Sequence, residues 1–183
     1  MPQTIKFYYP NEEFGEFSNF YVRPIEVNGV VWPVGTESYF QAMKSDDPKV
    51  QEYIRTQFTR PGQVKRYCHE QVALRLDWEN SVEIGPKLMA IYSDTEGLVV
   101  DRVKDHFMLT ALIYKFTQHK DLAEILLQTG DAHIIEDTQK VGSDPYWGNG
   151  PSGNGLNKLG RMLKLVRTYL SGHLRRMQAQ PTK

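Results

Sequence analysis

The sequence has one cysteine, no excess of charge and no long apolar run, and each of these absences excludes a class of protein. A lone Cys68 excludes an internal disulfide and a cysteine-based zinc cluster. Because 22 basic residues balance 22 acidic ones, the global positive field that draws proteins onto nucleic acids is missing. No stretch approaches the roughly 20 apolar residues that span a bilayer, and the start of the chain has no basic-then-apolar signal pattern. We therefore expect a cytoplasmic protein with no membrane partner.

Two further kinds of catalytic site are missing from the sequence. The five histidines show neither an HExxH motif nor a paired spacing, and no serine stands in a G-x-S-x-G elbow. We therefore expect neither a metal site nor a serine hydrolase. The remaining possibility is a site in which carboxylates carry out the catalysis, with indole rings nearby.

The residues that are present indicate one folded domain. At 183 residues, 40% of them hydrophobic, the chain is long enough for one sizeable core and short for two domains. The β-branched and aromatic run 5–9 predicts a strand. Two apolar-alternating runs around Asn28-Gly29 predict a hairpin over 24–33 with a type I′ turn. The N-terminal third is therefore expected to hold most of the sheet.

Helix signals dominate from residue 36 onward. The predicted helices cover 37–44, 48–57, 105–118, 121–129 and 156–172. Thr36 and Asp47 are the expected N-caps of the first two helices. Asp121 and Glu124 form a capping-box pattern for the fourth, and Gly172 is expected to end the last. The pattern predicts a mostly helical α+β domain over residues 1–172 with a small N-terminal hairpin and sheet.

Two segments do not fit this pattern. Residues 79–104 have weak periodicity and contain the turn signals Gly85-Pro86 and Gly97, so a surface insertion or a lid is expected there. The tail 173–183 is expected to fray.

The first constellation that could carry chemistry is ESYFQAMK at 37–44. In a helix Glu37, Gln41 and Lys44 share one face, while Phe40 and Met43 anchor the other. Such a face is either an ordinary solvated surface or, at the foot of the hairpin, one wall of a cleft.

The second constellation is the glycine-rich segment 142–155, which has five glycines together with Asp144 and Trp147. Its backbone N–H groups, those of Gly148 and Gly150 among them, could hold an anion at the start of the following helix while the indole offers a stacking face. It lacks the GK[ST] ending of a P-loop, and no parallel-strand pattern leads into it as in a Rossmann fold. A plain glycine-rich connector is the alternative.

The third constellation is Trp78, an indole flanked by Asp77 and Glu79. A buried core tryptophan is the ordinary interpretation of such a residue. A stacking face for a ligand base is the functional one.

Taken in order, these constellations resemble the YbiA-like or NADAR family. The motifs that carry the resemblance cover nearly the whole chain: FSNF at 17–20, WP at 32–33, ESYFQAMK at 37–44, Trp78, KFTQ at 115–118, LLQT at 126–129, DPYWGNG at 144–150 and NKLG at 157–160. The sequence departs from the family pattern at Ser38, where histidine is frequent, and at Asn149, where aspartate is frequent. The stretch 79–104 is also about twenty residues longer than the usual family spacing between the internal tryptophan and the following methionine, here Met108.

The resemblance implies an N-glycosidase that cleaves a ribose C1′–N bond. Some family members act on phosphoribosylamino-pyrimidine intermediates of riboflavin synthesis, and others are linked to ADP-ribose or NAD chemistry. The positions carried over are Glu37, Trp78 and Asp144, with Lys44 and Asn157 as lesser candidates.

Hydrolysis of such a bond develops oxocarbenium charge on the sugar while the departing nitrogen needs a proton, so two carboxyl groups are natural equipment and no cofactor is needed. We expect Glu37 to activate water or stabilise the cation, and Asp144 to hold ribose hydroxyls or share the acid–base work. Trp78 or Trp147 is expected to stack on the leaving base.

The expected partner is a small phosphoribosyl or ADP-ribosyl substrate. Lys44, Arg23 or the glycine-rich helix start could neutralise its phosphate. Two alternatives stay open. A non-catalytic ADP-ribose or nucleotide-binding module would not need Glu37 as a carboxylate. An enzyme acting on ADP-ribosylated nucleic acid would need a local basic surface, for which Lys65-Arg66 and residues 173–176 are the hints.

Overall fold

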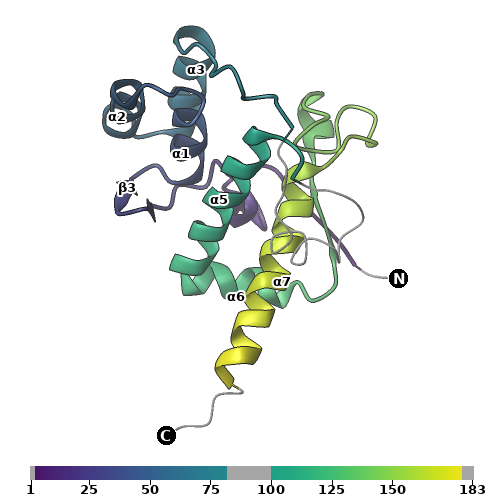
Figure 1. Ribbon diagram of the computed structural model, residues 1–183. Helices are drawn as coiled ribbons and strands as arrows, with labels where there is room; N and C mark the ends of the chain where they lie inside the picture. The colour runs from purple at the N-terminus through teal and green to yellow at the C-terminus, as the bar shows by residue number, and fades with distance from the viewer. Residues whose placement is uncertain (1–2, 82–99, 179–183) are drawn as a thin grey trace, which may run out of the picture.

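The computed structural model describes residues 3–81 and 100–178 and shows a mostly helical α+β fold (Figure 1), as the sequence predicted. Its elements, in chain order, are β1 (Thr4–Phe7), the 3₁₀ turn η1 (Gly15–Phe17), β2 (Ile25–Val27), β3 (Val30–Trp32), α1 (Thr36–Ala42), α2 (Pro48–Gln57), α3 (Pro61–Gln71), α5 (Val103–Gln118), α6 (Lys120–Gln128), β4 (His133–Glu136), η2 (Thr138–Val141) and α7 (Lys158–Gln178).

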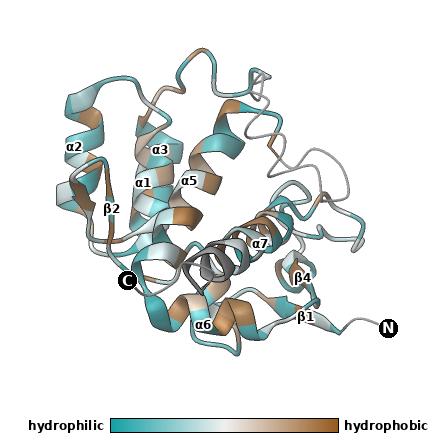
Figure 2. Ribbon diagram, turned by 60° about the horizontal axis from the view of Figure 1, so that its bottom comes forward, coloured by the Kyte–Doolittle hydropathy of each residue, from teal (hydrophilic) through white to brown (hydrophobic). Residues whose placement is uncertain are grey.

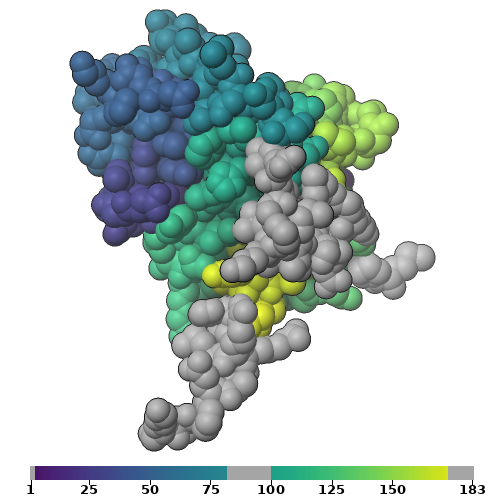
Figure 3. Space-filling view, in the orientation of Figure 1, coloured from purple at the N-terminus to yellow at the C-terminus, as the bar shows by residue number. Residues whose placement is uncertain are grey.

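The predicted hairpin is confirmed. β2 pairs antiparallel with β3, with Val27 opposite Val30. Asn28 and Gly29 have φ angles of 51° and 79°, the positive values that a type I′ turn requires at both central positions. Ile25, Val27 and Trp32 are buried against the helices that follow. Figure 3 shows the hairpin and α1–α3, purple to blue, on one side of the surface.

The parallel pairing of β1 with β4 was not predicted. Its register runs from Thr4 opposite His133 to Phe7 opposite Glu136. Because the carboxyl ends of parallel strands meet at one edge, the residues after β1 and those at the end of β4 come together. The strand expected over 5–9 ends two residues earlier, at Phe7. Its pairing partner is β4, which lies far beyond the N-terminal third of the chain.

The main core forms around α7, which lies between α5 and α6 on one side and β4 on the other (Figure 2). Leu159, Leu163 and Val166 are almost fully buried on its inner face. The helix approaches β4 closely, because a Cβ on Gly160 would lie 2.1 Å from the carbonyl oxygen of Ile134. Only glycine fits at this contact.

Several predicted helix ends were wrong for identifiable reasons. Gly35, with φ 82°, is the N-cap of α1, and Thr36 is already inside the helix. His119, not Asp121, is the N-cap of α6, and its ring contacts Arg23 and Pro24 instead of capping the helix. The carboxylate of Asp121 pairs with Arg23 at 2.7 Å. α7 begins at Lys158 and continues through Gly172, since one glycine costs a helix only about 1 kcal/mol.

Other boundaries agree or were missed. Asp47 caps α2 by accepting a hydrogen bond from the backbone N–H of Lys49, as expected. α5 begins at Val103, two residues before the predicted start. The sequence analysis did not predict α3.

The expected insertion or lid at 79–104 lies mostly outside the described residues, which omit 82–99. Its two ends are held together. Ser81 bridges Arg102 in antiparallel fashion, and Glu79 accepts hydrogen bonds from Arg102 and Lys104 at 2.7 and 2.8 Å. The tail expected to fray after Gly172 is helical to residue 178, and 179–183 also lie outside the described residues. No described helix is long and apolar enough to cross a membrane.

Candidate active site

A cavity of ≈ 360 Å³ lies where β1 and β4 end, a volume in the range of small-molecule sites. Its walls come from the segments after β1 and η1, from α1, α3 and α5, from β4, and from the glycine-rich segment 142–155. Among the residues carried over from the sequence, Glu37, Lys44, Trp78, Asp144 and Trp147 line it. Residues far apart in the sequence therefore meet in one site.

Glu37 lies in the first turn of α1, with 1% of its surface exposed. Its Oε1 accepts a hydrogen bond from Gln41 Nε2 at 2.7 Å, and its Oε2 accepts a short one from Asn19 Nδ2. Burial raises the pKa of Glu37, while these amide donors, Lys44 and Lys65 oppose that rise. Both carboxylate oxygens are thus held by donors that suit the ionised form.

The segment that carries Asn19 is fixed by a fully buried lysine. Lys115 on α5 donates from Nζ to the carbonyl oxygens of Glu16 at 2.6 Å and Ser18 at 2.9 Å. The side chain therefore reaches the residue next to Asn19. Lys115 positions the Asn19 amide against Glu37.

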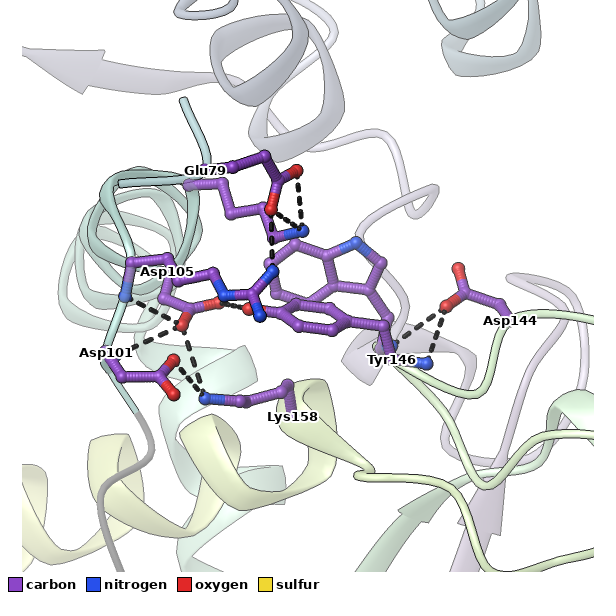
Figure 4. Close-up of polar contacts among 9 residues, drawn as sticks. Glu79, Asp101, Asp105, Asp144, Tyr146 and Lys158 are labelled. Atoms are coloured by element: carbon purple, nitrogen blue, oxygen red, sulfur yellow. Dashed lines mark hydrogen bonds and ion pairs between the residues drawn. The ribbon is translucent and has the colours of Figure 1, made fainter. Parts of the chain in front are cut away.

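Asp144 lines the same cavity from a strained position. Its φ is 51°, and its Oδ1 accepts hydrogen bonds from the backbone N–H groups of Tyr146 at 3.2 Å and Trp147 at 2.9 Å (Figure 4). The aspartate thus shapes the turn that presents the Trp147 indole.

Polar contacts attach this turn to the helices beneath it (Figure 4). The hydroxyl of Tyr146 donates to Asp105 at 2.7 Å. Lys158, at the start of α7, pairs with Asp101 at 2.7 Å and with Asp105 at 3.2 Å. The Tyr146 carbonyl also accepts a hydrogen bond from the backbone N–H of Lys158 at 3.2 Å, so the glycine-rich segment is tied to both α5 and α7.

Both indoles of the site contact Phe40. Trp78 packs against it at a centroid distance of 5.3 Å, and Trp147 meets it edge-on at 5.4 Å. Trp78 is 4% exposed and stacks on Phe107 in the core. The core interpretation of Trp78 is correct, and the residue also forms part of the cavity wall.

Three lysines supply positive charge to the cavity: Lys44, Lys65 and Lys104. Burial lowers the pKa of Lys44, and Glu37 opposes this. Lys104 pairs with Glu79 at 2.7 Å. Lys44 and Lys65 also border a neighbouring groove of ≈ 380 Å³, whose other lining residues are Gly62, Arg66 and His69.

Four expected site residues are absent from the cavity lining and make structural contacts instead: Arg23, Gly148, Gly150 and Asn157. Arg23 binds Asp121. Asn157 holds the end of β4, accepting from the Glu136 N–H at 3.0 Å and donating to Ile134 at 2.9 Å.

The two glycines expected to cradle an anion use their N–H groups inside the protein. Gly148 N–H donates to the Asp144 carbonyl at 3.3 Å, and Gly150 N–H donates to Thr138 Oγ1 at 2.8 Å. Gly150 has φ 65°. A Cβ at Gly148 would lie 2.4 Å from the Thr138 side chain. Both glycines are therefore present for backbone geometry and packing.

Glu136 is the site residue that sequence reasoning missed most completely. It is the last residue of β4, is 8% exposed and lines the cavity. No local signal marked it, because β4 itself was not predicted. Asn19 stood within the FSNF motif but was not carried over, and Lys65 was noted only as part of a basic pair. Among the described residues, no group of three potential His, Cys, Asp or Glu metal ligands occurs.

Comparison with known proteins identifies the family and supports the fold. The model of the NADAR domain matches residues 6–171. The N-glycosidase YbiA of Shigella flexneri is 35% identical over 167 residues, covering 91% of this chain and 88% of that protein. A riboflavin biosynthesis protein of Vibrio vulnificus is 34% identical over 94% of this chain, which matches 40% of that longer protein. The NMR structure of Escherichia coli YbiA superposes with a TM-score of 0.75 at 33% identity, covering 98% of this chain and 90% of that one.

Replacement of Lys115 by methionine is expected to change how stability depends on pH. Burial lowers the pKa of Lys115 from 10.5 to about 7, so unfolding takes up a proton between those values. The free energy of unfolding contributed by this group therefore rises with pH, by at most about 1.4 kcal/mol per unit. Urea titrations of both proteins from pH 7 to 9 measure the difference. Parallel pH profiles would contradict the buried, proton-releasing lysine.

Gly148→Ala is expected to destabilise the protein by about 1–3 kcal/mol, because the added methyl group overlaps the Thr138 side chain. Gly142→Ala is the control for steric overlap, since its Cβ would meet nothing within 4 Å. Its φ of 63° makes that variant a measure of backbone strain alone. Thermal denaturation compares the two, and a smaller loss at Gly148 would refute the packing role.

Proposed function

Since the chain belongs to the NADAR domain family, we propose that it is an N-glycosidase that hydrolyses the C1′–N bond of a phosphoribosylated or ADP-ribosylated substrate. The observation that carries this proposal is the buried Glu37 carboxylate, held by two amide donors in a cavity that also contains indoles and lysines. The reaction needs only water as co-reactant. The names of the similar N-glycosidases and riboflavin biosynthesis protein support it.

Glu37 is the group that acts on the sugar carbon. A carboxylate beside C1′ can orient and deprotonate the attacking water and can stabilise the developing oxocarbenium charge. The amide donors Asn19 and Gln41 fix its two oxygens, so the carboxylate needs little reorganisation during the reaction. Asp144 lines the cavity as well and holds ribose hydroxyls or shares the acid–base work.

The aromatic part of the cavity receives the leaving base. Trp78, Trp147 and Phe40 form one apolar cluster in its wall. Trp147, which is half-buried, is the indole better placed for stacking, because Trp78 already stacks on Phe107.

The lysines receive the phosphate of the substrate. Lys44 follows Gln41 by three residues, just after the end of α1, and lines the cavity together with Lys65. The groove that these two lysines share with Arg66 and His69 favours a second candidate function, removal of ADP-ribose from a nucleic acid. That substrate would extend over α3, and its binding would weaken with salt.

Glu37→Gln is expected to lower turnover by at least about 100-fold, the contribution of a positioned acid–base group. Its Tm should change little, because Gln41 Oε1 has no partner among the described residues and can accept from the new amide. Release of ribose phosphate and calorimetric melting measure the two effects.

Glu26→Gln is the matched control, since Glu26 is exposed on β2. A well-folded Glu37→Gln protein that keeps full turnover would refute the mechanism. Absence of turnover in the wild type, with tight ligand binding in both proteins, would indicate a non-catalytic binding module.

Lys44→Ala is expected to lower kcat/KM by about 10–100-fold with a phosphorylated ribosyl substrate, the worth of one charge-assisted hydrogen bond. With the corresponding nucleoside the loss should stay within about threefold. Lys120→Ala, at a side chain that is 90% exposed on α6, is the control. Equal losses on both substrates would assign Lys44 to the support of Glu37.

A further inference from the structure

Glu136 is a second buried carboxyl group in the cavity, with surroundings unlike those of Glu37. Its backbone is fixed by Asn157 and by the N–H of Asn149, which donates to its carbonyl at 3.0 Å. Its side chain lines the cavity, yet its buried Oε2 has no hydrogen-bond partner among the described residues. A buried carboxyl oxygen without a partner is costly unless a ligand engages it.

The charged and titratable groups facing Glu136 come from four parts of the fold. They are Tyr8 after β1, Glu37 on α1, Lys65 on α3 and Asp144 in the glycine-rich segment. Burial, followed by the negative charge of Asp144, raises the pKa of Glu136 to about 8, with Lys65 opposing the rise. These surroundings therefore favour the protonated form of the Glu136 carboxyl near neutral pH.

The hydrogen bonds of the two glutamates suit opposite tasks. Each oxygen of Glu37 accepts a hydrogen bond from an amide, as a carboxylate does. Glu136 presents an unpartnered oxygen to the same cavity, as a hydrogen-bond donor awaiting an acceptor does. Burial raises the pKa of both carboxyls, so the assignment of base and acid follows from the amide donors on Glu37 and the unpartnered Oε2 of Glu136.

We propose that Glu136 is the general acid that protonates the departing nitrogen, an assignment that rests on the proposed function. As the C1′–N bond breaks, its electron pair stays on nitrogen, which takes the proton from the Glu136 carboxyl. The oxygen of water forms the new bond to C1′ and gives its proton to Glu37. The products are the free amine and the ribosyl hemiacetal, and proton exchange with solvent restores both carboxyls.

Asp144 is less suited to this donation. Its Oδ1 already accepts two backbone N–H groups, so its role in the turn competes with proton transfer. Its contribution to the acid step is indirect, because its negative charge keeps the proton on Glu136.

The first test varies the leaving group. With a phosphoribosylated aminopyrimidine, whose nitrogen must be protonated, Glu136→Gln should lose about 100–1,000-fold in kcat/KM. With a ribosylpyridinium 5′-phosphate, whose pyridine leaves neutral without a proton, the loss should stay below about tenfold. Glu37→Gln should lose activity on both substrates, and Glu26→Gln on neither. Equal losses for Glu136→Gln on the two substrates, or no loss on the first, would overturn the proposal.

The second test follows pH with the aminopyrimidine substrate alone. Because the acid must be protonated in the free enzyme, kcat/KM of the wild type should fall as pH rises through about 8. Glu136→Gln should lack this alkaline fall. An alkaline limb that persists in the variant would assign it to another group.

The third test needs no activity and separates the proposal from the proposed function. Carbon-13 NMR of the labelled protein should show one glutamate carboxyl titrating near pH 8, absent from the spectrum of Glu136→Gln. A Glu136 carboxyl that titrates below pH 5 would overturn the assignment even in an active enzyme. Failure of the wild type to cleave any ribosyl substrate would instead overturn the proposed function.

Discussion

The parallel pairing of β1 with β4 is the constraint on which the site depends. Without it, Tyr8 and Glu136 would not share a cavity, because they lie far apart in the sequence. A two-stranded sheet is marginal by itself. Here α7 buries one face of β4 through the contact at Gly160, and the side chain of Asn157 fixes the end of the strand. The NKLG motif at 157–160 therefore supports the site from behind, and Leu159 is its residue in the cavity wall.

Burying two glutamates in one cavity carries a cost that the fold meets in two different ways. At Glu37 the cost is offset by the amides of Asn19 and Gln41. The first of these depends on Lys115, itself buried and bound to two carbonyl oxygens. At Glu136 the cost is reduced by retaining the proton, since a neutral acid is cheaper to bury than a carboxylate. The stability of the protein and the protonation states of its buried glutamates are thus linked.

Sequence reasoning predicted the features that neighbouring residues determine. Asn28-Gly29 and Asp47-Pro48 are sufficient to set a turn and a helix start, so both were correct. It failed where a distant partner decides the outcome. Asp121 was taken for a cap, but in the fold it binds Arg23, and β4 is a strand because β1 lies beside it.

The same distinction explains which parts of the candidate site were found. Glu37 and Asp144 were identified through their motifs, and both line the cavity. Arg23 and the two glycines of the expected anion cradle were reasonable by residue type, yet ion pairing and packing occupy them. Glu136 has no motif that reports burial, and its environment exists only after the strands have paired.

The balance of charge within the cavity would let a protein of zero net charge bind the proposed anionic substrate while Glu136, the proposed acid, keeps its proton. Among the described lining residues, Glu37, Glu136 and Asp144 face Lys44, Lys65 and Lys104. A phosphate that pairs with Lys65 would weaken the effect of this ammonium group, which lowers the pKa of Glu136, and would add negative charge nearby. Substrate binding would therefore strengthen the hold of Glu136 on its proton until the leaving nitrogen becomes the stronger base. By reciprocity, the proton on Glu136 favours binding of the anion.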